Sequence, residues 1–450
     1  GSSVCLRRRV SAPAKIRMMH TAWLLLALGV GRVNAAEWAV LVAGSNGFDN
    51  YRHQADVCHA YRLLTKRGFD PEKIITMVYD DAANDTENPY RGKLYNYPWK
   101  TMAQAVDVRE GCQIDYKGKD VTPDKFIAVL LGDRTAGGRV LGSKADDHVF
   151  VNFVDHGGTG IIAFPDMEDV LHASKLISTL KAMYAKKMYG QLTFYLETCE
   201  SGSMFKGLLP KNLPVYALTA ANADESSWGT YCGSESKVAG KEVGSCLGDL
   251  FSVNWMMDTE KHPKKESLWG QFHRVKRLTR KSHVMQYGQV FKFDRELVSD
   301  FQGPGSGNLS ASNDVDFEPV AFVNSRNARL DYLYYKYSKS GASQDAELLI
   351  QEIREREAVK DMAAFLQRAI PDSGENRPKA RELWTDELLS CHEQAVSHFG
   401  RRCGWKQGRL VLSKTLYNLC QRTNSDAARV LTAVSDVCGP TSGVAETLVV

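Results

Sequence analysis

Short apolar runs alternate with longer amphipathic segments between Glu37 and about Asp300, a pattern typical of a mostly parallel sheet covered by helices. The runs are rich in β-branched and aromatic residues, and they predict five strands: Trp38–Ala43, Ile74–Tyr79, His148–Val154, Leu192–Leu196 and Val215–Ala220. The clearest segments between them predict helices over Ala55–Arg67, Thr122–Leu131 and Leu171–Tyr189. The expected fold class is therefore α/β, with the sheet flanked by helices.

The pattern changes after this block. Residues 301–329 are rich in Gly, Ser, Asn and Pro, and they predict a linker. Residues 330–450 contain few strand signals and several helical ones, such as Asp345–Gln367 and Arg381–His398. Because this part also contains Cys391, Cys403, Cys420 and Cys438, we expect a small all-α domain stapled by disulfides.

The beginning of the chain resembles a secretory signal. Basic residues from Arg7 to Arg17 precede the apolar run Ala22–Val30, and small residues end at Ala35. The run is about 9 residues long, well short of the ~20 that a membrane-spanning helix needs. We therefore expect residues 1–35 to comprise a signal peptide and upstream residues, with a start at Met18 or Met19. Residues 36–300 then form the α/β domain, and no membrane span is expected.

Composition and charge narrow the choice of partners. With 43% hydrophobic and 24% charged residues, the 450-residue chain is typical of a folded globular protein. The 57 Lys and Arg residues against 53 Asp and Glu leave a net charge of +4, without long basic runs beyond the N-terminus. This balance provides no electrostatic surface for nucleic acid, so that class of partner is excluded.

Entry into the secretory pathway implies an oxidising compartment. Ten cysteines are present, and nine remain after cleavage removes Cys5, so at least one thiol is unpaired. The four cysteines of the tail allow three connectivities, which their spacing does not separate. Two sequons, at Asn84 and Asn308, are candidate glycosylation sites.

Two neighbouring strand ends carry residues suited to covalent catalysis. The third predicted strand runs into Asp155-His156-Gly157, and the fourth into Glu197-Thr198-Cys199. Parallel sheets place their working residues at these ends, and a Cys beside a His is a nucleophile with its base. A single buried Cys is usually structural and a single His is often a cap, but the pair predicts an active site. The backbone N–H groups of Gly157 and Cys199 are the candidate oxyanion donors.

Several motifs in order carry a family resemblance. They are Ala43–Gly47, Asn50–Asp56, Asp155–Gly157, Glu197–Ser203 and Ser282–Gly288. Together they resemble the legumain family of asparaginyl endopeptidases, also called vacuolar processing enzymes, strongly over Glu37–Gly288 and more loosely in the tail. Because Cys232 and Cys246 bracket a loop, the chain is more similar to the plant-type branch. The resemblance implies a caspase-like fold and no metal or organic cofactor.

The resemblance also implies roles for particular residues. Cys199 is the implied nucleophile, His156 the general base and acid, and Asn50 the residue that orients the imidazole, with Asp155 beside the base. The implied specificity pocket consists of Arg52, His53, Glu197, Ser227 and Asp249. A guanidinium and carboxylates together satisfy the acceptor and the donors of an Asn carboxamide. A charged Asp would be repelled unless acid protonates a partner. Without the resemblance, Arg52 and Asp249 would be interpreted as a surface ion pair.

Three positions depart from the family pattern or refine it. Thr198 replaces the small Ala that is more usual before the nucleophile, and Gly158-Thr159 differs slightly from the plant-type turn. Gly229 lies where bulkier residues accompany efficient peptide ligases, so its small size favours a hydrolase. These positions bear on the rate and on the fate of the acyl intermediate.

In the family, the helical tail caps the active site as an inhibitory prodomain, and cleavage in the linker releases it. The candidate cleavage sites are Asn308, Asn313, Asp314, Asn324 and Asn327. Asn324 is preferred because Phe322–Arg326 best resembles the plant-type activation region. Acid is expected both to weaken the cap, by protonating carboxylates at its interface, and to start self-cleavage.

The resemblance suggests disulfide pairs as well. The implied pairs are Cys391 with Cys420, Cys403 with Cys438, and Cys232 with Cys246. Cys58, Cys112 and Cys199 then remain as thiols.

We therefore expect a cysteine endopeptidase zymogen that hydrolyses peptide bonds after Asn, and less readily after Asp. Its expected partners are protein and peptide substrates containing Asn, together with its own prodomain. The expected compartment is an acidic vacuole or lysosome, with secretion as an alternative. The two rival hypotheses are a transpeptidase that uses the same Cys and His, and a catalytically silent binding protein.

Overall fold

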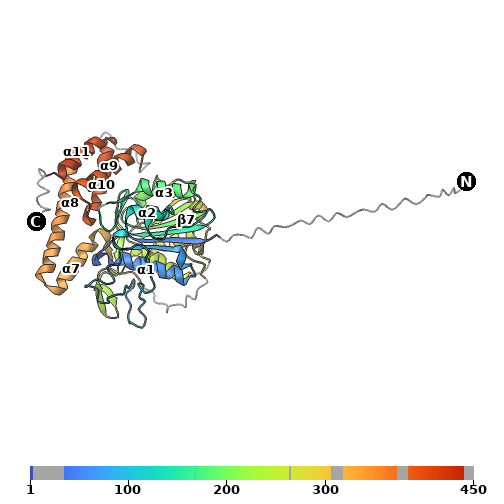
Figure 1. The fold of residues 1–450 in the computed structure, drawn as a ribbon, viewed down its shortest axis with the longest axis horizontal. Coiled ribbons are helices and arrows are strands. Elements are labelled where there is room, and N and C mark those ends of the chain that lie inside the picture. The colour runs from blue at the N-terminus through green and yellow to red at the C-terminus, as the bar shows by residue number, and fades with distance from the viewer. Residues whose placement is uncertain (4–34, 168, 263–264, 306–317, 372–383, 440–450) are drawn as a thin grey trace. The chain divides into compact units, whose positions relative to one another are not determined.

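The computed structural model describes residues 1–3, 35–167, 169–262, 265–305, 318–371 and 384–439. From Ala35 onward these residues form one compact unit, shown in Figure 1. The expected signal peptide and the sequon at Asn308 lie outside the described residues. The other sequon residue, Asn84, is exposed in a turn, and its glycosylation stays a prediction.

A six-stranded sheet forms the centre of the α/β part, with strand order β13-β8-β7-β3-β1-β2. The strands are β1 Glu37–Ala43, β2 Ile74–Val78, β3 His148–Val154, β7 Gln191–Glu197, β8 Val215–Thr219 and β13 Met285–Gly288. The first five are parallel, and β13 pairs antiparallel with β8. The five predicted strands are confirmed to within two residues, and the α/β fold class is confirmed.

Helices cover both faces of this sheet, because alternate strand residues face two separate apolar cores. Ala39 and Leu41 of β1 belong to one core, whereas Val40 and Val42 belong to the other. The first core is closed by α1 Tyr51–Lys66, α4 Leu250–Lys261 and α5 Leu268–Leu278, and the second by α2 Pro123–Leu130 and α3 Ala173–Ala185. The short α6 Val290–Phe293 follows β13. In Figure 1, α1 lies on one side of the strands, and α2 and α3 lie on the other.

Helix α1 begins four residues before its predicted start at Ala55. Its first turn contains Arg52, His53 and Gln54, and the amphipathic pattern does not extend into it. All three side chains are nevertheless buried. Polar side chains buried at the first turn of a helix require partners, and these partners are part of the candidate site.

Three small sheets surround the carboxyl edge of the central sheet. One contains β4 Gly157–Gly158, β5 Ile161–Ile162 and β6 Leu171–His172, and a hairpin pairs β10 Gly233–Val238 with β11 Lys241–Gly244. The third has the order β12-β9-β14, with β12 Gly248–Asp249, β9 Trp228–Thr230 and β14 Val323–Asn324. Strand β14 comes from the expected linker, so this part of the linker is paired with the α/β part.

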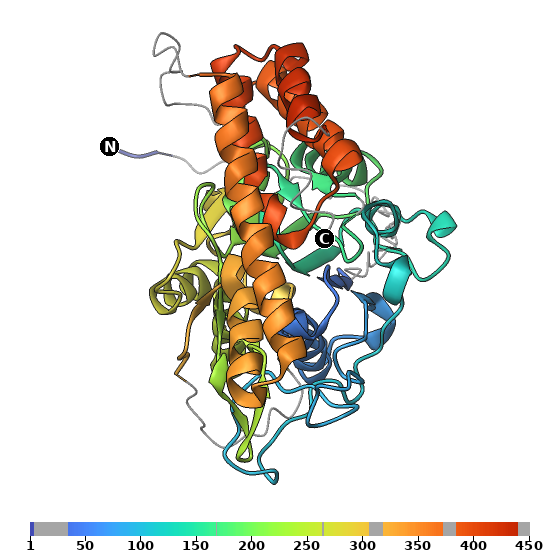
Figure 2. The same cartoon turned by 90° about the vertical axis from the view of Figure 1, so that its left-hand side faces the viewer.

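The helical tail (residues 328–439) packs against the α/β part. Its helices are α7 Ala328–Ser340, α8 Ser343–Ala369, α9 Asp386–Cys403, α10 Leu412–Arg422 and α11 Ala427–Val437. Their apolar core also includes Ile161, Ala163 and Val170 from the α/β part. Figure 2 shows α8 as the long orange helix in front of the sheet. The described parts of the chain pack together, so the structure does not separate them at residues 300 and 329. The domain boundaries there stay predictions.

Four disulfides join eight of the cysteines. The structure links Cys232 with Cys246, Cys391 with Cys420, and Cys403 with Cys438. It also links Cys58 with Cys112, which corrects the expectation that these two are thiols. Cys58 lies inside α1 and Cys112 in the loop after β2. They are 54 residues apart in the sequence, but their Cα atoms are 5.4 Å apart in the structure. Among the described cysteines, only Cys199 is free.

Replacing Cys58 and Cys112 together by Ala is expected to lower the free energy of unfolding by about 2–4 kcal/mol, because the bridge restricts a long loop in the unfolded chain. A denaturant titration measures the loss. The matched control replaces Cys232 and Cys246, which are 14 residues apart and should contribute about 1 kcal/mol less by loop closure alone. Equal losses for the two variants would contradict this explanation.

No helix of the described residues is long and apolar enough to cross a membrane.

Candidate active site

Three candidate side chains come from the segments that follow β1, β3 and β7. Asn50 lies after β1, His156 two residues after β3, and Cys199 two residues after β7. These strands are neighbours in the sheet, and β1 is where the chain order reverses, since β2 lies on one side of it and β3 on the other. Open α/β sheets place their sites at this kind of position. The sheet topology thus brings the three residues to one edge.

His156 is oriented by Asn50. The two side chains are 2.7 Å apart, from His156 Nε2 to Asn50 Oδ1. Asn50 Nδ2 donates to the Asn46 carbonyl at 3.0 Å, which fixes the amide so that its oxygen faces the imidazole. His156 Nε2 must therefore carry the proton, and Nδ1 is left as the ring nitrogen that can accept one.

Cys199 is a buried thiol, and the Oγ of Ser227 lies 3.8 Å from its sulfur. Burial raises the pKa of the Cys199 thiol, and the nearby Arg326 opposes this effect. Burial also holds the pKa of His156 well below its usual value, with Arg52 and Arg326 contributing. Both shifts favour neutral groups, so the resting pair is a thiol and a neutral imidazole.

Gly157 allows the two strand ends to approach closely. A Cβ at this position would lie 2.8 Å from the Cys199 carbonyl oxygen and 2.8 Å from Thr198 Oγ1. The Thr198 hydroxyl donates to the same carbonyl at 3.1 Å, so the unusual Thr is accommodated beside Cys199. The backbone of Gly157 therefore lies directly against the residue that bears the thiol.

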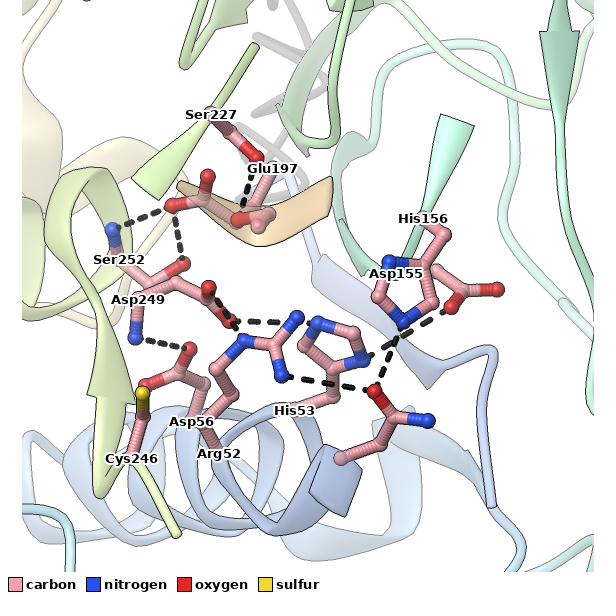
Figure 3. Close-up of polar contacts among 12 residues, drawn as sticks. Arg52, His53, Asp56, Asp155, His156, Glu197, Ser227, Cys246, Asp249 and Ser252 are labelled. Carbon is pink, nitrogen blue, oxygen red and sulfur yellow. Dashed lines mark hydrogen bonds and ion pairs between the residues drawn. The ribbon is translucent and has the colours of Figure 1, made fainter. Parts of the chain in front are cut away.

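A second cluster of buried polar side chains lies beside His156 (Figure 3). Arg52 and His53 come from α1, Glu197 from the end of β7, and Asp249 from β12. Arg52 Nε donates to Asp249 Oδ1 at 2.9 Å, and both side chains are at most 1% exposed. Arg52 and Asp249 thus form a buried ion pair, and the interpretation as a surface pair is wrong.

Three atoms of this cluster lack a hydrogen-bond partner, and we refer to them as the open pocket atoms. They are Arg52 Nη2, Glu197 Oε1 and Asp249 Oδ2, the last of which lies 3.5 Å from His53 Nε2. Buried polar atoms without partners are costly, so such a set indicates a place for a ligand that has both an acceptor and donors. A primary amide is the smallest side-chain group with that combination.

Residues that the sequence did not single out hold this cluster in place. Ser252 donates to Glu197 Oε2 through its backbone N–H at 2.9 Å and its hydroxyl at 3.1 Å. Asp56 accepts from the Asp249 backbone N–H at 3.0 Å, and Ser45 Oγ lies 2.6 Å from His53 Nδ1. Asp56 and Ser45 lie inside the motifs that carry the family resemblance, and this could have singled them out from the sequence. No comparable feature of the sequence singles out Ser252.

The carboxyl groups of the cluster are buried together, and their ionisation is affected. Burial raises the pKa values of Glu197 and Asp56 well above their usual range, and the nearby Asp249 raises both further. Burial also raises the pKa of Asp249, against the lowering effect of Arg52. Asp155, 3.7 Å from His53 Nδ1, likewise has a strongly raised pKa because it is buried. These groups take up protons at a higher pH than exposed carboxyls do.

The linker segment (residues 320–327) lies across the site. Val323 and Asn324 pair antiparallel with Gly229 and Trp228, and the Ser325 N–H donates to the Ser227 carbonyl at 3.0 Å. Ser325 Oγ lies 3.1 Å from Ser227 Oγ, next to the thiol. This strand addition is how many extended peptides bind.

The preferred cleavage residue, Asn324, does not occupy the cluster. Its side chain accepts a hydrogen bond from the Arg326 N–H at 3.0 Å. Asn324 thereby caps the short 3-10 helix Ser325–Asn327, and it is the Ser325 hydroxyl that lies against Ser227, next to the thiol. In this register the linker segment lies at the site, but the amide of Asn324 does not occupy the place of the open pocket atoms.

The helical tail closes the other side. Asn50 Nδ2 lies 3.4 Å from Gln407 Oε1, at the start of a short 3-10 helix, Gln407–Val411, before α10. A Cβ on Gly158 would lie 2.6 Å from the Leu410 carbonyl oxygen and 2.3 Å from Ser413 Oγ. The tail therefore contacts both the His156 loop and the residue that orients His156.

Two groups of side chains have the composition of a metal site. The ligand atoms of His53, Asp155 and His156 lie within 4.8 Å of one another. His53 Nδ1 and His156 Nε2 are already hydrogen-bonded to Ser45 and Asn50, however. The second group, Asp258, His262 and Glu266, is bridged by Arg274. Both arrangements are explained by protein contacts.

Comparisons with known proteins agree with this geometry. A family model described as Peptidase C13 family matches residues 37–304. Hemoglobinase of Schistosoma japonicum is 40% identical over 412 residues, which cover 90% of this chain and 93% of that protein. Legumain of Rattus norvegicus is 38% identical over 445 residues, covering 92% and 97%. A vacuolar-processing enzyme of Ricinus communis is 44% identical over 331 residues, covering 70% and 65%.

The relatives from plants and animals share similar fractions of the sequence, so the plant-type assignment stays a prediction. A solved caspase-1 of Spodoptera frugiperda aligns with a TM-score of 0.33 at 10% identity, covering 54% of this chain and 76% of that one. The family model and the long relatives carry the assignment. The chain therefore belongs to the peptidase C13 family and is a cysteine endopeptidase of the legumain type.

Proposed function

We propose that the protein hydrolyses peptide bonds after Asn, with Cys199 as nucleophile and His156 as general base and acid. The observation that carries the proposal is the position of the open pocket atoms beside the buried thiol. Arg52 Nη2 is a donor for the amide oxygen, and Glu197 Oε1 and Asp249 Oδ2 are acceptors for the amide N–H groups. An Asn side chain satisfies all three, whereas an aliphatic side chain satisfies none.

The chemistry follows from the tautomer of His156. Its Nδ1 takes the thiol proton, and the thiolate attacks the carbonyl carbon after Asn. The N–H groups of Gly157 and Cys199 stabilise the oxyanion. The C–N bond then breaks, and the imidazolium gives its proton to the leaving amine. Water attacks the thioester with His156 again as base, and Cys199 is restored as a thiol.

Asn50 has a positioning role in this proposal. Its amide oxygen accepts from His156 Nε2, and Arg52 Nη1, 3.4 Å away, also points to that oxygen. The pocket and the base are thus connected through Asn50. This connection supports a mechanism in which the bound Asn and the proton acceptor are aligned by the same residue.

The linker segment and the helical tail act as the inhibitor in this proposal, because they occupy the space in which a substrate would bind. Several ion pairs cross the interface, among them Glu200–Arg326, Asp49–Arg329 and Glu242–Lys339. Burial raises the pKa of Glu200, although Arg326 opposes this effect, whereas Tyr335 and Lys339 of α7 lower the pKa of Glu242.

A carboxyl whose pKa is lowered by its docked partner stabilises docking only while it is ionised. Of the carboxyls named here, Glu242 has the lowered pKa, so its contribution to docking is lost as the pH falls through that pKa. Release of the tail in acid fits an acidic vacuole or lysosome, the compartment suggested by relatives named vacuolar-processing enzymes. Secretion is the alternative destination.

The register of the linker segment leads to a prediction about self-cleavage. Ser325→Asn places a carboxamide where the side chain already faces the thiol. We expect this variant, after mild acidification, to be cut after residue 325 and faster than the unchanged protein is cut after Asn324. Intact-mass spectrometry over time locates the bond.

The matched variant is Asn324→Ser, which removes the preferred site and keeps the register. It should lose cleavage after residue 324. If Ser325→Asn protein is cut only after Asn324, at the unchanged rate, the register does not control self-cleavage.

The direct test of the proposed function is mass spectrometry on acidified protein given a peptide with one internal Asn and one internal Gln. We expect two fragments, separated after Asn, with one oxygen from water in the new carboxyl group. Joining of the fragment to an added amine without hydrolysis would instead indicate the transpeptidase. An uncut peptide after release of the tail would indicate a binding protein and overturn the proposal.

A further inference from the structure

Glu200 is a buried carboxylate beside the thiol, and the proposed reaction gives it no role. It directly follows Cys199 and is 6% exposed. Its backbone has a φ of 47°, in the left-handed region, and its N–H donates to the Glu225 carbonyl at 2.7 Å. Non-glycine residues seldom adopt this conformation, and those that do cluster at functional sites. The backbone therefore fixes the direction of this side chain.

The partner of Glu200 is a cation from the linker segment. Arg326 forms an ion pair with Glu200 Oε2, and the same Arg326 Nη2 lies 3.3 Å from the Gly157 carbonyl oxygen. The guanidinium thus binds two acceptors, one after His156 and one directly after the thiol-bearing residue. Arg prefers such paired acceptors to a single one.

The position of Arg326 corresponds to the leaving-group side of a substrate. Ser325 faces the thiol, and the chain before it pairs with β9 as an extended peptide does. Arg326 is the next residue toward the C-terminus. A substrate that follows the same path would therefore present its first residues after the scissile bond to Glu200.

Glu200 loses this partner when the linker segment leaves. The other charged groups near it are Asp224 and the tail residue Lys414, which pair with each other. In the described part of the chain, no second ion pair of Glu200 is found. A buried carboxylate without a cation is costly, and its charge opposes ionisation of the neighbouring thiol. A cation supplied by the substrate would remove both costs.

We propose that Glu200 and the Gly157 carbonyl form a subsite for an Arg side chain within the first two residues after the scissile bond. Lys binds there more weakly, because a compact ammonium is more strongly hydrated than a guanidinium and loses more on burial. The proposal of this subsite rests on the proposed cleavage after Asn and makes the substrate preference more specific. It adds a charge preference on the side of the bond opposite to the Asn pocket.

The test measures kcat/KM of the activated enzyme for peptides with a single Asn. The residue one or two positions after Asn is Arg, citrulline, Gln or Glu, and all else is constant. Citrulline is close to Arg in shape but carries no charge. We expect Arg to exceed citrulline and Gln by about tenfold at one of the two positions, and Glu to be the slowest.

Two variants locate the effect. Glu200→Gln should bring the ratio of Arg to citrulline close to one, and this ratio remains measurable even if the overall rate falls. Asp224→Asn removes a nearby but exposed carboxylate and should keep the ratio. If Glu200→Gln protein does not fold, the comparison of Arg with citrulline on the unchanged enzyme still decides the matter.

Equal rates for Arg and citrulline at both positions would overturn the subsite. If every peptide is nevertheless cut after Asn, the proposed function stands and only the subsite fails. If no peptide is cut, the proposed function fails, and the subsite fails with it.

Discussion

The Cys199→Ala protein is expected to lose at least about ten-thousand-fold in kcat/KM, because the proposed acyl intermediate forms on the Cys199 sulfur. Cys199 is the only free cysteine among those described, and it lies beside the strand end that bears His156. The same variant should retain its helical tail after acidification if the release depends on self-cleavage. Peptide assays and intact-mass spectrometry measure the two losses.

The matched control is Thr198→Ala, one residue away. The Thr198 hydroxyl donates only to the Cys199 carbonyl, so its removal should change kcat/KM by no more than about tenfold. Both variants should unfold at the temperature of the unchanged protein. If Cys199→Ala protein still loses its tail at the same bonds in pure acidic buffer, self-processing is wrong, whatever the peptide assay shows.

The sheet and its working edge could be predicted because their signals are local. Runs such as His148–Val154 combine β-branched and aromatic residues, and each one enters a strand of the central sheet. The chemistry at a strand end is also local, so His156 and Cys199 were found from their positions. Parallel pairing then brings them together without any further information.

The remainder of the site depends on contacts between segments far apart in the chain. The first turn of α1 is polar, and only its partners Asp249 and Ser45 explain why Arg52 and His53 are buried there. Cys58 and Cys112 are joined across the α1 face of the sheet, which no spacing rule specifies.

The register of β14 is a further example. It depends on the pairing of Val323 with Gly229, and one residue of slip would turn Asn324 toward the thiol. The Gly at position 229 leaves room for the Cys232–Cys246 bridge, because a Cβ there would lie 3.1 Å from Cys246 Sγ. The sequence could therefore indicate a candidate cleavage residue in the linker, but not the register in which the linker is held.

The choice between Asn and its close analogues is expected to depend on the open pocket atoms, and its magnitude is large. Replacing Asn by Leu in a peptide should lower kcat/KM by about ten-thousand-fold, because a pocket built for hydrogen bonds rejects a side chain that makes none. Replacing Asn by Asp should be nearly as harmful at neutral pH, since a carboxylate would face Glu197 and Asp249.

Cleavage after Asp should increase as the pH falls. The pKa values of Glu197 and Asp249 are raised by burial, so these groups become neutral at a higher pH than ordinary carboxyls do. A protonated Glu197 donates to the Asp side chain instead of repelling it. The ratio of Asp to Asn cleavage measured across an acidic pH series should therefore rise toward low pH.

Glu197→Gln separates charge from shape in this pocket. Its amide oxygen can still accept from Ser252, and its amide nitrogen replaces the open acceptor Oε1 by a donor. We expect the ratio of Asp to Asn cleavage to rise at least about a hundredfold at neutral pH and to lose most of its pH dependence. Glu110→Gln, an exposed change outside the site, is the control. An unchanged ratio of Asp to Asn cleavage in Glu197→Gln protein would show that a group other than Glu197 discriminates between the two side chains.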